Sequence, residues 1–165
     1  MSVCLTATAP GRIFFRTEPG ISKESKDIDL IFRKALQHSH RTASSLWREL
    51  LREKVLEIYA ECSKEGWDGY DAKPISMESF LGTLQLLDQL PNSILTPEAV
   101  PEPTGEIALE WRVGNEILFS LTVSNGTLVY AGIFGGSSRQ HGEEQFFDLL
   151  PKTILDLLAR YFFKS

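Results

Sequence analysis

The stretch IALEWRVGNEILFSLTVSNGTLVYAGIF, residues 107–134, decides the fold of this 165-residue chain. Apolar residues alternate with polar ones in 107–113 and 117–123, which is the period of a β-strand with one buried face. Asn125-Gly126 is a strong signal for a two-residue type I′ turn, and a third β-rich run follows it. The stretch therefore predicts a meander of three antiparallel strands.

The lengths of the two turns predict which residues face one another across the strands. The Asn-Gly turn places Leu121 opposite Tyr130, with both on the apolar face. A two-residue loop before the second strand would put a glutamate opposite Phe119. We therefore predict a three-residue loop, 114–116, which sets Trp111 opposite Phe119. A slip of one residue would move every side chain to the other face.

The other face of the third strand is also apolar. It carries Val129, Ala131 and Ile133. A strand that is apolar on both faces is typical of a sheet whose two faces are both covered. We therefore expect this strand to be central or partly covered on both sides.

Three helices and two irregular segments flank the meander. Residues 44–64 repeat apolar side chains at three- and four-residue spacing, 76–90 begins at a serine N-cap, and about 149–163 is again amphipathic. Residues 91–106 contain four prolines and are predicted to be extended and edge-like, while 134–145 is a polar, glycine-rich loop. The predicted fold class is α+β: a three- to four-stranded antiparallel meander with helices on one face, preceded by a helical N-terminal arm.

Charge divides the chain into two parts. Residues 1–43 carry seven Lys or Arg and four acidic residues, a net +3 that leaves −8 for the rest of a chain whose total is −5. We predict a basic, partly irregular N-terminal arm, 1–43, and a single α+β domain, 44–165. The acidic domain argues against nucleic-acid binding, because phosphate contacts need clustered cations. The arm could contact an acidic partner or RNA, but a solvated arm of mixed charge is the simpler interpretation.

The composition is not that of a membrane protein or of a disulfide scaffold. No apolar run approaches the length of a membrane span, and the N-terminus lacks the pattern of a signal peptide. Cys4 and Cys62 are too few for a disulfide framework. Cys62 falls on the apolar stripe of its helix, which favours a buried structural thiol. We expect a cytoplasmic protein without membrane contact.

The residues that could carry chemistry match no catalytic or metal-binding pattern. His38 and His40 would not converge on one ion in either a strand or a helix, and no Gly-x-Ser-x-Gly motif is present. Residues 135–142, with Arg139 and His141, could cradle an anion. They match neither a P-loop nor a GxGxxG motif, so a flexible surface loop is the simpler interpretation. We predict no catalytic residue, no cofactor and no metal.

The connector EGWDGYDAKPIS, residues 65–76, is the remaining candidate site. Asp68 and Asp71 could act as paired carboxylates, but a structural role in which they accept backbone N–H groups is favoured. We predict that Trp67 and Tyr70 anchor the connector on the core. The candidate binding residues of the whole chain are Trp67, Asp68, Tyr70, Asp71, Arg139 and His141.

Two motifs together resemble one protein family. They are Trp67-Asp68-Gly69-Tyr70-Asp71-Ala72-Lys73-Pro74-Ile75 and Gly105-Glu106-Ile107-Ala108-Leu109-Glu110-Trp111. With the Asn-Gly hairpin that follows, the chain resembles small, largely uncharacterised bacterial proteins with a WDGYGA-x-P segment and a G-x-I-x-LEW strand. The resemblance covers about residues 64–163. Asp71 stands where the family pattern has glycine, which raises the question of whether this position needs a positive φ. The resemblance supports the fold and implies no catalytic mechanism.

Two functions are compatible with these observations. The first is a non-catalytic protein-binding or regulatory module, with another protein as its partner, such as a bacterial accessory in toxin–antitoxin, phage or defence systems. The alternative is an enzyme or small-ligand-binding protein that uses the stretches 67–71 and 135–142. The alternative requires these two stretches to surround one concave pocket.

Overall fold

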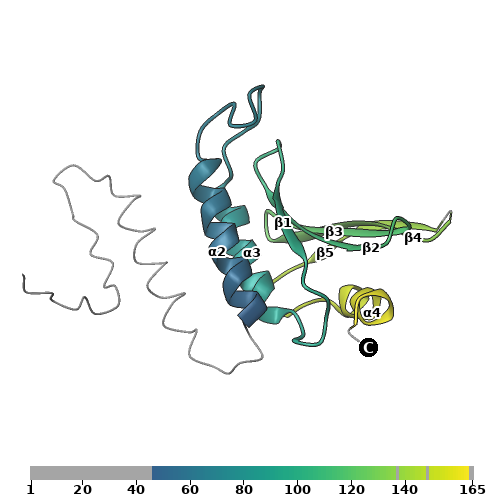
Figure 1. Cartoon of the computed structure of the whole chain (residues 1–165). Coiled ribbons are helices and arrows are strands. Elements are labelled where there is room, and N and C mark those ends of the chain that lie inside the picture. Colours follow the sequence, from purple (N-terminus) through teal and green to yellow (C-terminus); the bar gives the residue numbers. More distant parts are fainter. Residues whose placement is uncertain (1–45, 137, 148, 164–165) are drawn as a thin grey trace, which may run out of the picture. The chain divides into compact units, whose positions relative to one another are not determined.

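The computed structural model describes residues 46–136, 138–147 and 149–163. These residues form an α+β fold, with an antiparallel sheet in the order β1-β2-β3-β4-β5 and three helices (Figure 1). The N-terminal arm predicted for 1–43 lies outside the described residues. The elements are α2 Leu46–Glu61, α3 Met77–Gln89, β1 Glu98–Pro101, β2 Ile107–Val113, β3 Ile117–Ser124, β4 Thr127–Phe134, β5 Arg139–Gln145 and α4 Lys152–Tyr161.

The sheet has five strands, so the prediction of three or four is wrong in number. β1 comes from the proline-rich segment and lies at one edge, as predicted. β5 comes from the segment predicted to be a glycine-rich loop, and it pairs with β4 from Thr127 to Ile133. Its polar sequence gave no strand signal because an edge strand with little buried surface needs no apolar alternation.

The predicted register of the meander is confirmed. Trp111 faces Phe119, and Leu121 faces Tyr130. Both residues of the turn between β3 and β4 have positive φ angles, 50° at Asn125 and 70° at Gly126, as a type I′ turn requires.

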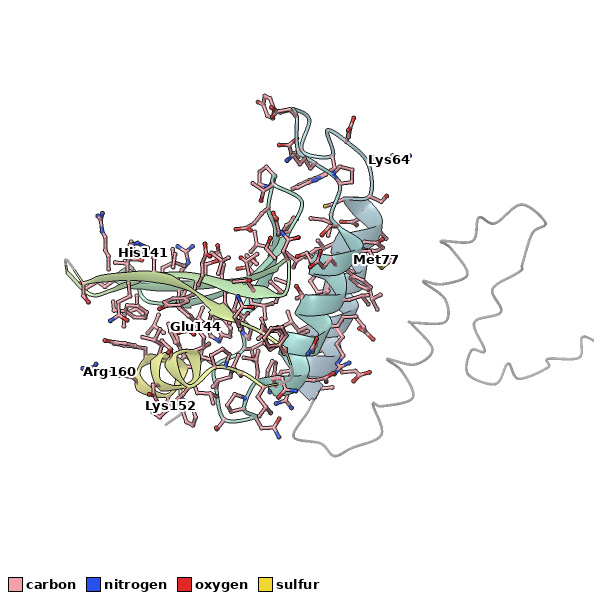
Figure 2. The ribbon with its side chains drawn as sticks, turned by 180° about the vertical axis from the view of Figure 1, so that it is seen from behind. Lys64, Met77, His141, Glu144, Lys152 and Arg160 are labelled. Carbon is pink, nitrogen blue, oxygen red and sulfur yellow. The ribbon has the colours of Figure 1, made fainter. Side chains whose placement is uncertain are left out.

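The inner face of the sheet carries the core. Phe119 of β3 lies among aromatic rings, with centroid distances of 5.8 Å to Trp111 and 5.9 Å to Phe162, the residue that ends α4. α3 approaches the same face so closely that a Cβ on Gly82 would lie 2.4 Å from Val123 Cγ1. α3 and α4 therefore cover the inner face, and α2 packs on α3 and β1 (Figures 1 and 2).

The ends of the helices follow local capping chemistry. Ser76 is the N-cap of α3, since its Oγ accepts a hydrogen bond of 3.0 Å from Ser79 N. The C-terminal turn of α3 is bonded by α2, because Arg48 Nε donates to Leu87 O at 2.9 Å. α4 is shorter than predicted, since Pro151 precedes its first turn. None of the described helices combines the length and apolar composition that a membrane crossing requires.

Candidate functional site

The connector between α2 and α3 is held by its own backbone. Asp68 Oδ1 accepts hydrogen bonds from Tyr70 N at 2.8 Å and from Ala72 N at 3.3 Å, and Gly69 has a φ of 85°. The backbone-accepting role predicted for both aspartates is confirmed for Asp68 only, since no described backbone N–H donates to the Asp71 side chain. Asp71 is exposed, and Asn125 is the only non-glycine residue with a positive φ in the described part of the chain. Position 71 therefore does not need a residue that tolerates positive φ.

The prediction that Trp67 and Tyr70 anchor the connector on the core is wrong for both residues. Tyr70 is 85% exposed, so its assignment to the core is wrong. Trp67 is half-buried, and its Nε1 donates to Lys73 O at 2.9 Å, inside the connector itself. Ala72 and Ile75 are the residues that reach the core. A large aromatic residue suggests burial, but an indole that finds a backbone carbonyl in its own loop does not need a core partner.

Arg139 and His141 lie on β5 and not in a loop. Both side chains are exposed on the outer face of the sheet, opposite Ile133 and Ala131 of β4. They line a hollow of about 560 Å³ whose wall also includes Leu118. The connector lies beyond the helix ends, away from His141 (Figure 2). Neither of the two hollows on the sheet contains a residue from 67–71, so the six predicted site residues form two separate groups.

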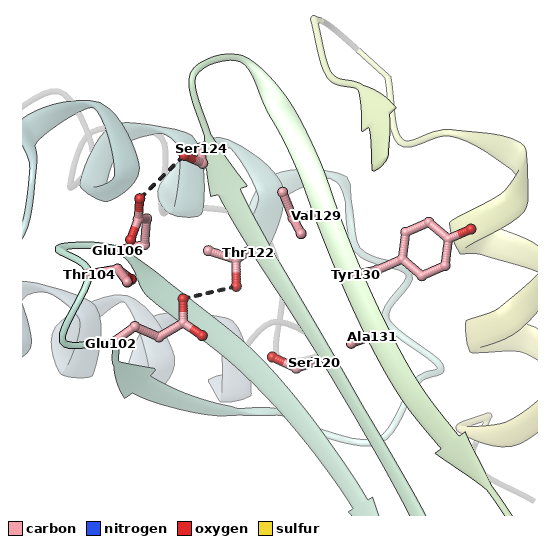
Figure 3. Close-up of a pocket in the computed structure, with 9 residues that line it drawn as sticks. All are labelled: Glu102, Thr104, Glu106, Ser120, Thr122, Ser124, Val129, Tyr130 and Ala131. Atoms are coloured by element: carbon pink, nitrogen blue, oxygen red, sulfur yellow. Dashed lines mark hydrogen bonds between the residues drawn. The ribbon is translucent and has the colours of Figure 1, made fainter. Parts of the chain in front are cut away.

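A second hollow of about 300 Å³ lies on the outer face and is acidic (Figure 3). Glu102 Oε2 accepts a hydrogen bond from Thr122 Oγ1 at 3.4 Å, and Glu106 Oε1 accepts one from Ser124 Oγ at 3.3 Å. Glu106 Oε2 is buried, and no described residue donates a hydrogen bond to it. The residues that line this second hollow are Glu102, Thr104, Glu106, Ser120, Thr122, Ser124, Val129, Tyr130 and Ala131.

The electrostatics of this hollow favour a cationic group. Burial, followed by the neighbouring charges of Glu106 and Glu110, raises the pKa of Glu102, and the Thr122 hydroxyl opposes the shift. A cation placed between Glu102 and Glu106 would reverse this effect and supply the donor that Glu106 Oε2 lacks. The described residues contain no group of three His, Cys, Asp or Glu side chains that could hold a metal ion. The two carboxylates and the unpartnered Glu106 Oε2 fit a lysine, an arginine or an organic ammonium group, each of which donates hydrogen bonds.

We expect Glu102→Gln to stabilise the protein at pH 7 by less than about 1 kcal/mol, because solvent screens much of the charge repulsion at this half-exposed carboxylate. The folded-state pKa of Glu102 lies above its unfolded value, so the folded chain binds more protons between the two values. Stability therefore falls as pH rises through that window. Thermal unfolding should show a higher Tm for Glu102→Gln at pH 7 and no difference well below the ordinary glutamate pKa of about 4.3.

The control is Glu116→Gln, at an exposed position in the β2–β3 turn. It should leave the Tm unchanged at both pH values. An equal gain at pH 7 and at low pH for Glu102→Gln would contradict an electrostatic cause.

The two hollows form one continuous surface, because both are lined by Ser120 and Ala131. Its apolar floor includes Val129, 38% exposed, and Ile133, 40% exposed. The second apolar face predicted for this strand is thus present, and β4 lies inside the sheet. Within the described residues no helix covers it. This surface on the outer face of the sheet has an apolar floor, with the carboxylates of Glu102 and Glu106 at one end and the guanidinium group of Arg139 at the other.

Sequence reasoning missed Glu102 and Glu106. They belong to the turn that joins β1 to β2, in the segment predicted to be extended. Their only sequence signal is a pair of acids around a proline and a glycine, which is ordinary for a turn. The partner hydroxyl of Glu102, on Thr122, lies 20 residues away in the sequence and is brought close only by sheet pairing.

Comparisons of the chain with protein-family models, curated proteins and solved structures find no match. The resemblance to proteins with the WDGYGA-x-P segment stays a prediction. The function is therefore inferred from the geometry of the outer face.

Proposed function

We propose that this protein is a non-catalytic protein-binding module and that the outer face is its contact surface. One observation carries the proposal: two adjoining hollows on a sheet face that no described element covers. Exposed apolar side chains gathered into one hollowed patch are typical of an interaction site. A regulatory accessory role in a bacterial toxin–antitoxin, phage or defence system belongs to the same proposal and rests on the sequence resemblance alone.

The chemistry of the outer face describes the partner. Val129 and Ile133 would contact apolar side chains, and each Å² of apolar surface removed from water contributes about 25 cal/mol. Glu102 and Glu106 would bind a lysine or arginine side chain of the partner. Arg139 would bind an acidic group of the partner. Charges of opposite sign at the two ends would set the orientation of the partner more than its affinity.

The enzyme or small-ligand hypothesis receives less support. It needs the stretches 67–71 and 135–142 around one pocket, and the two sheet hollows contain residues only from the second. Binding without chemistry is the function that this geometry supports best.

Ile133→Lys is expected to abolish peptide binding to the outer face. A random peptide library displayed on phage would be selected on the full-length protein. Selected peptides should combine apolar residues with a lysine or arginine. Their affinity should fall at least about 30-fold for Ile133→Lys, the loss expected when a central apolar contact is removed. The position is 40% exposed, so the variant should keep its Tm to within a few degrees.

Leu81→Lys is the matched control, because Leu81 is 38% exposed on α3. It should retain the affinity of the selected peptides to within about twofold. Peptides that bind Ile133→Lys as well as the unmodified protein would contradict the proposal. Loss of peptide binding in Glu106→Gln but not in Ile133→Lys would indicate that the ligand is a small cation.

A further inference from the structure

β5 presents an unpaired backbone edge. Phe134 N donates to Ser138 O, and Phe146 N donates to Gly126 O, each at 2.9 Å. Along an antiparallel pair of strands, residue pairs that exchange backbone hydrogen bonds alternate with pairs that do not. These two bonds show which residues of β5 exchange hydrogen bonds with β4. The even-numbered residues of β5 therefore bond to β4. The odd-numbered ones, Arg139, His141, Glu143 and Gln145, direct their N–H and C=O groups away from the sheet. No strand among the described residues pairs with that side.

The two edges of the sheet differ in their capacity to accept another strand. β1 has four residues, ends in Pro101 and contacts α2. β5 has seven residues and no proline, and most of it is exposed. A strand of this kind is a template for pairing with another chain, and charges on it commonly protect against that pairing. On β5, however, the charges are ordered in a way that favours one particular partner.

The charge order of β5 is self-complementary. In RQHGEEQ, the guanidinium group of Arg139 and the imidazole ring of His141 precede Gly142, and the carboxylates Glu143 and Glu144 follow it. A second, antiparallel copy of the strand centred on Gly142 places His141 opposite Glu143 and Arg139 opposite Gln145. Opposite charges across a strand pair stabilise it, and like charges destabilise it. No like charges face one another in this register.

We propose that two copies of this chain pair antiparallel along β5, with a two-fold axis at Gly142. The register joins four residue pairs that each exchange two backbone hydrogen bonds, because all the odd-numbered residues direct these groups outward. A shift of two residues one way would place Arg139 opposite Glu143 but also His141 opposite His141, and a shift the other way would place Glu143 opposite Glu143; each shifted register keeps three bonded pairs instead of four. Both shifts also shorten the overlap, so the register at Gly142 is the favoured one.

Exposed apolar residues support the same arrangement. Phe147 and Leu149 follow β5 and are largely exposed. The same register continued past Gln145 would bring Phe147 next to the β4–β5 turn of the second copy, which contains Gly135 and Gly136. The pairing would thus remove apolar surface from water. It would also join the two outer faces into one continuous sheet surface, so it extends the proposed function without depending on it.

Charge reversal tests the register. We expect sedimentation velocity of the full-length protein to show a dimer. Glu143→Arg and His141→Glu should each weaken dimerisation by about tenfold or more, because each change acts twice across the two-fold axis. A mixture of these two variants should form a heterodimer, since the introduced glutamate then faces the introduced arginine, and the unchanged His141 faces the unchanged Glu143. A chain that carries both substitutions should dimerise again.

A proline variant tests the backbone contact. Glu143→Pro removes an N–H that points away from β4, so the sheet should stay intact by circular dichroism while the dimer is lost. A monomeric unmodified protein at several hundred micromolar would overturn the proposal. So would a dimer that survives Glu143→Pro, or single variants that fail to recover dimerisation when mixed. Ile133→Lys should leave the dimer intact, which separates this inference from the proposed binding function.

Discussion

Phe162→Ala is expected to lower the free energy of unfolding by about 3–5 kcal/mol, which is the largest loss for any single side chain considered for this protein. Phe162 is fully buried, with ring centroids at 5.9 Å from Phe119 and 6.1 Å from Trp111. Its removal leaves a cavity at the point where α4 meets the sheet. Urea denaturation followed by tryptophan fluorescence measures the loss directly, because Trp111 lies in the same cluster.

The neighbouring residue is the control. Phe163 is 44% exposed, so Phe163→Ala should cost less than about 1 kcal/mol. If the two variants lost equal free energy of unfolding, the C-terminal end of α4 would have to be rotated about the helix axis relative to the structure.

Gly105→Ala is expected to cost about 3 kcal/mol. Gly105 has a φ of 99°, and a Cβ there would lie 2.9 Å from Pro74 O. The backbone around it is also held in place, because Ser76 N donates to Gly105 O at 2.8 Å. Strain from the positive φ contributes about 1–2 kcal/mol, and the clash with a backbone oxygen that cannot move freely contributes the rest. Thermal unfolding provides the measurement.

Gly69→Ala separates the two causes. Gly69 has a φ of 85°, and a Cβ there would meet no atom within 4 Å. Its loss should therefore be about 1–2 kcal/mol, from backbone strain alone. A Gly105→Ala variant no less stable than Gly69→Ala would show that the connector and the β1–β2 turn do not approach as closely as the structure indicates.

Gly105 also gives a physical account of the two motifs that carry the family resemblance. Lys73 N donates to Pro103 O at 2.9 Å, so the connector with WDGY and the turn before the LEW strand are bonded to one another. The same turn carries Glu102 and Glu106. The connector therefore holds in place the turn that lines the acidic hollow, although the aromatic residues of the connector do not line the hollow themselves.

Much of the fold could be predicted because its signals are local. The pairing of Trp111 with Phe119 followed from strand period and turn length, and Ser76 indicated the start of α3 by its own side chain. Less of the candidate site could be predicted. Arg139 and His141 were selected for a loop that proved to be a strand, and Tyr70 was assigned to a core that it does not enter.

The sequence by itself determined the meander, its register and the buried face, because a period of two residues and an Asn-Gly turn allow only one such arrangement. Only the tertiary structure decided that RQHGEEQ is a strand and that Glu102 meets Thr122. The physical reason is the same in both cases. Hydrophobic alternation records which residues leave water, whereas an exposed edge strand and a surface hollow keep their residues in water and depend on pairing between distant segments.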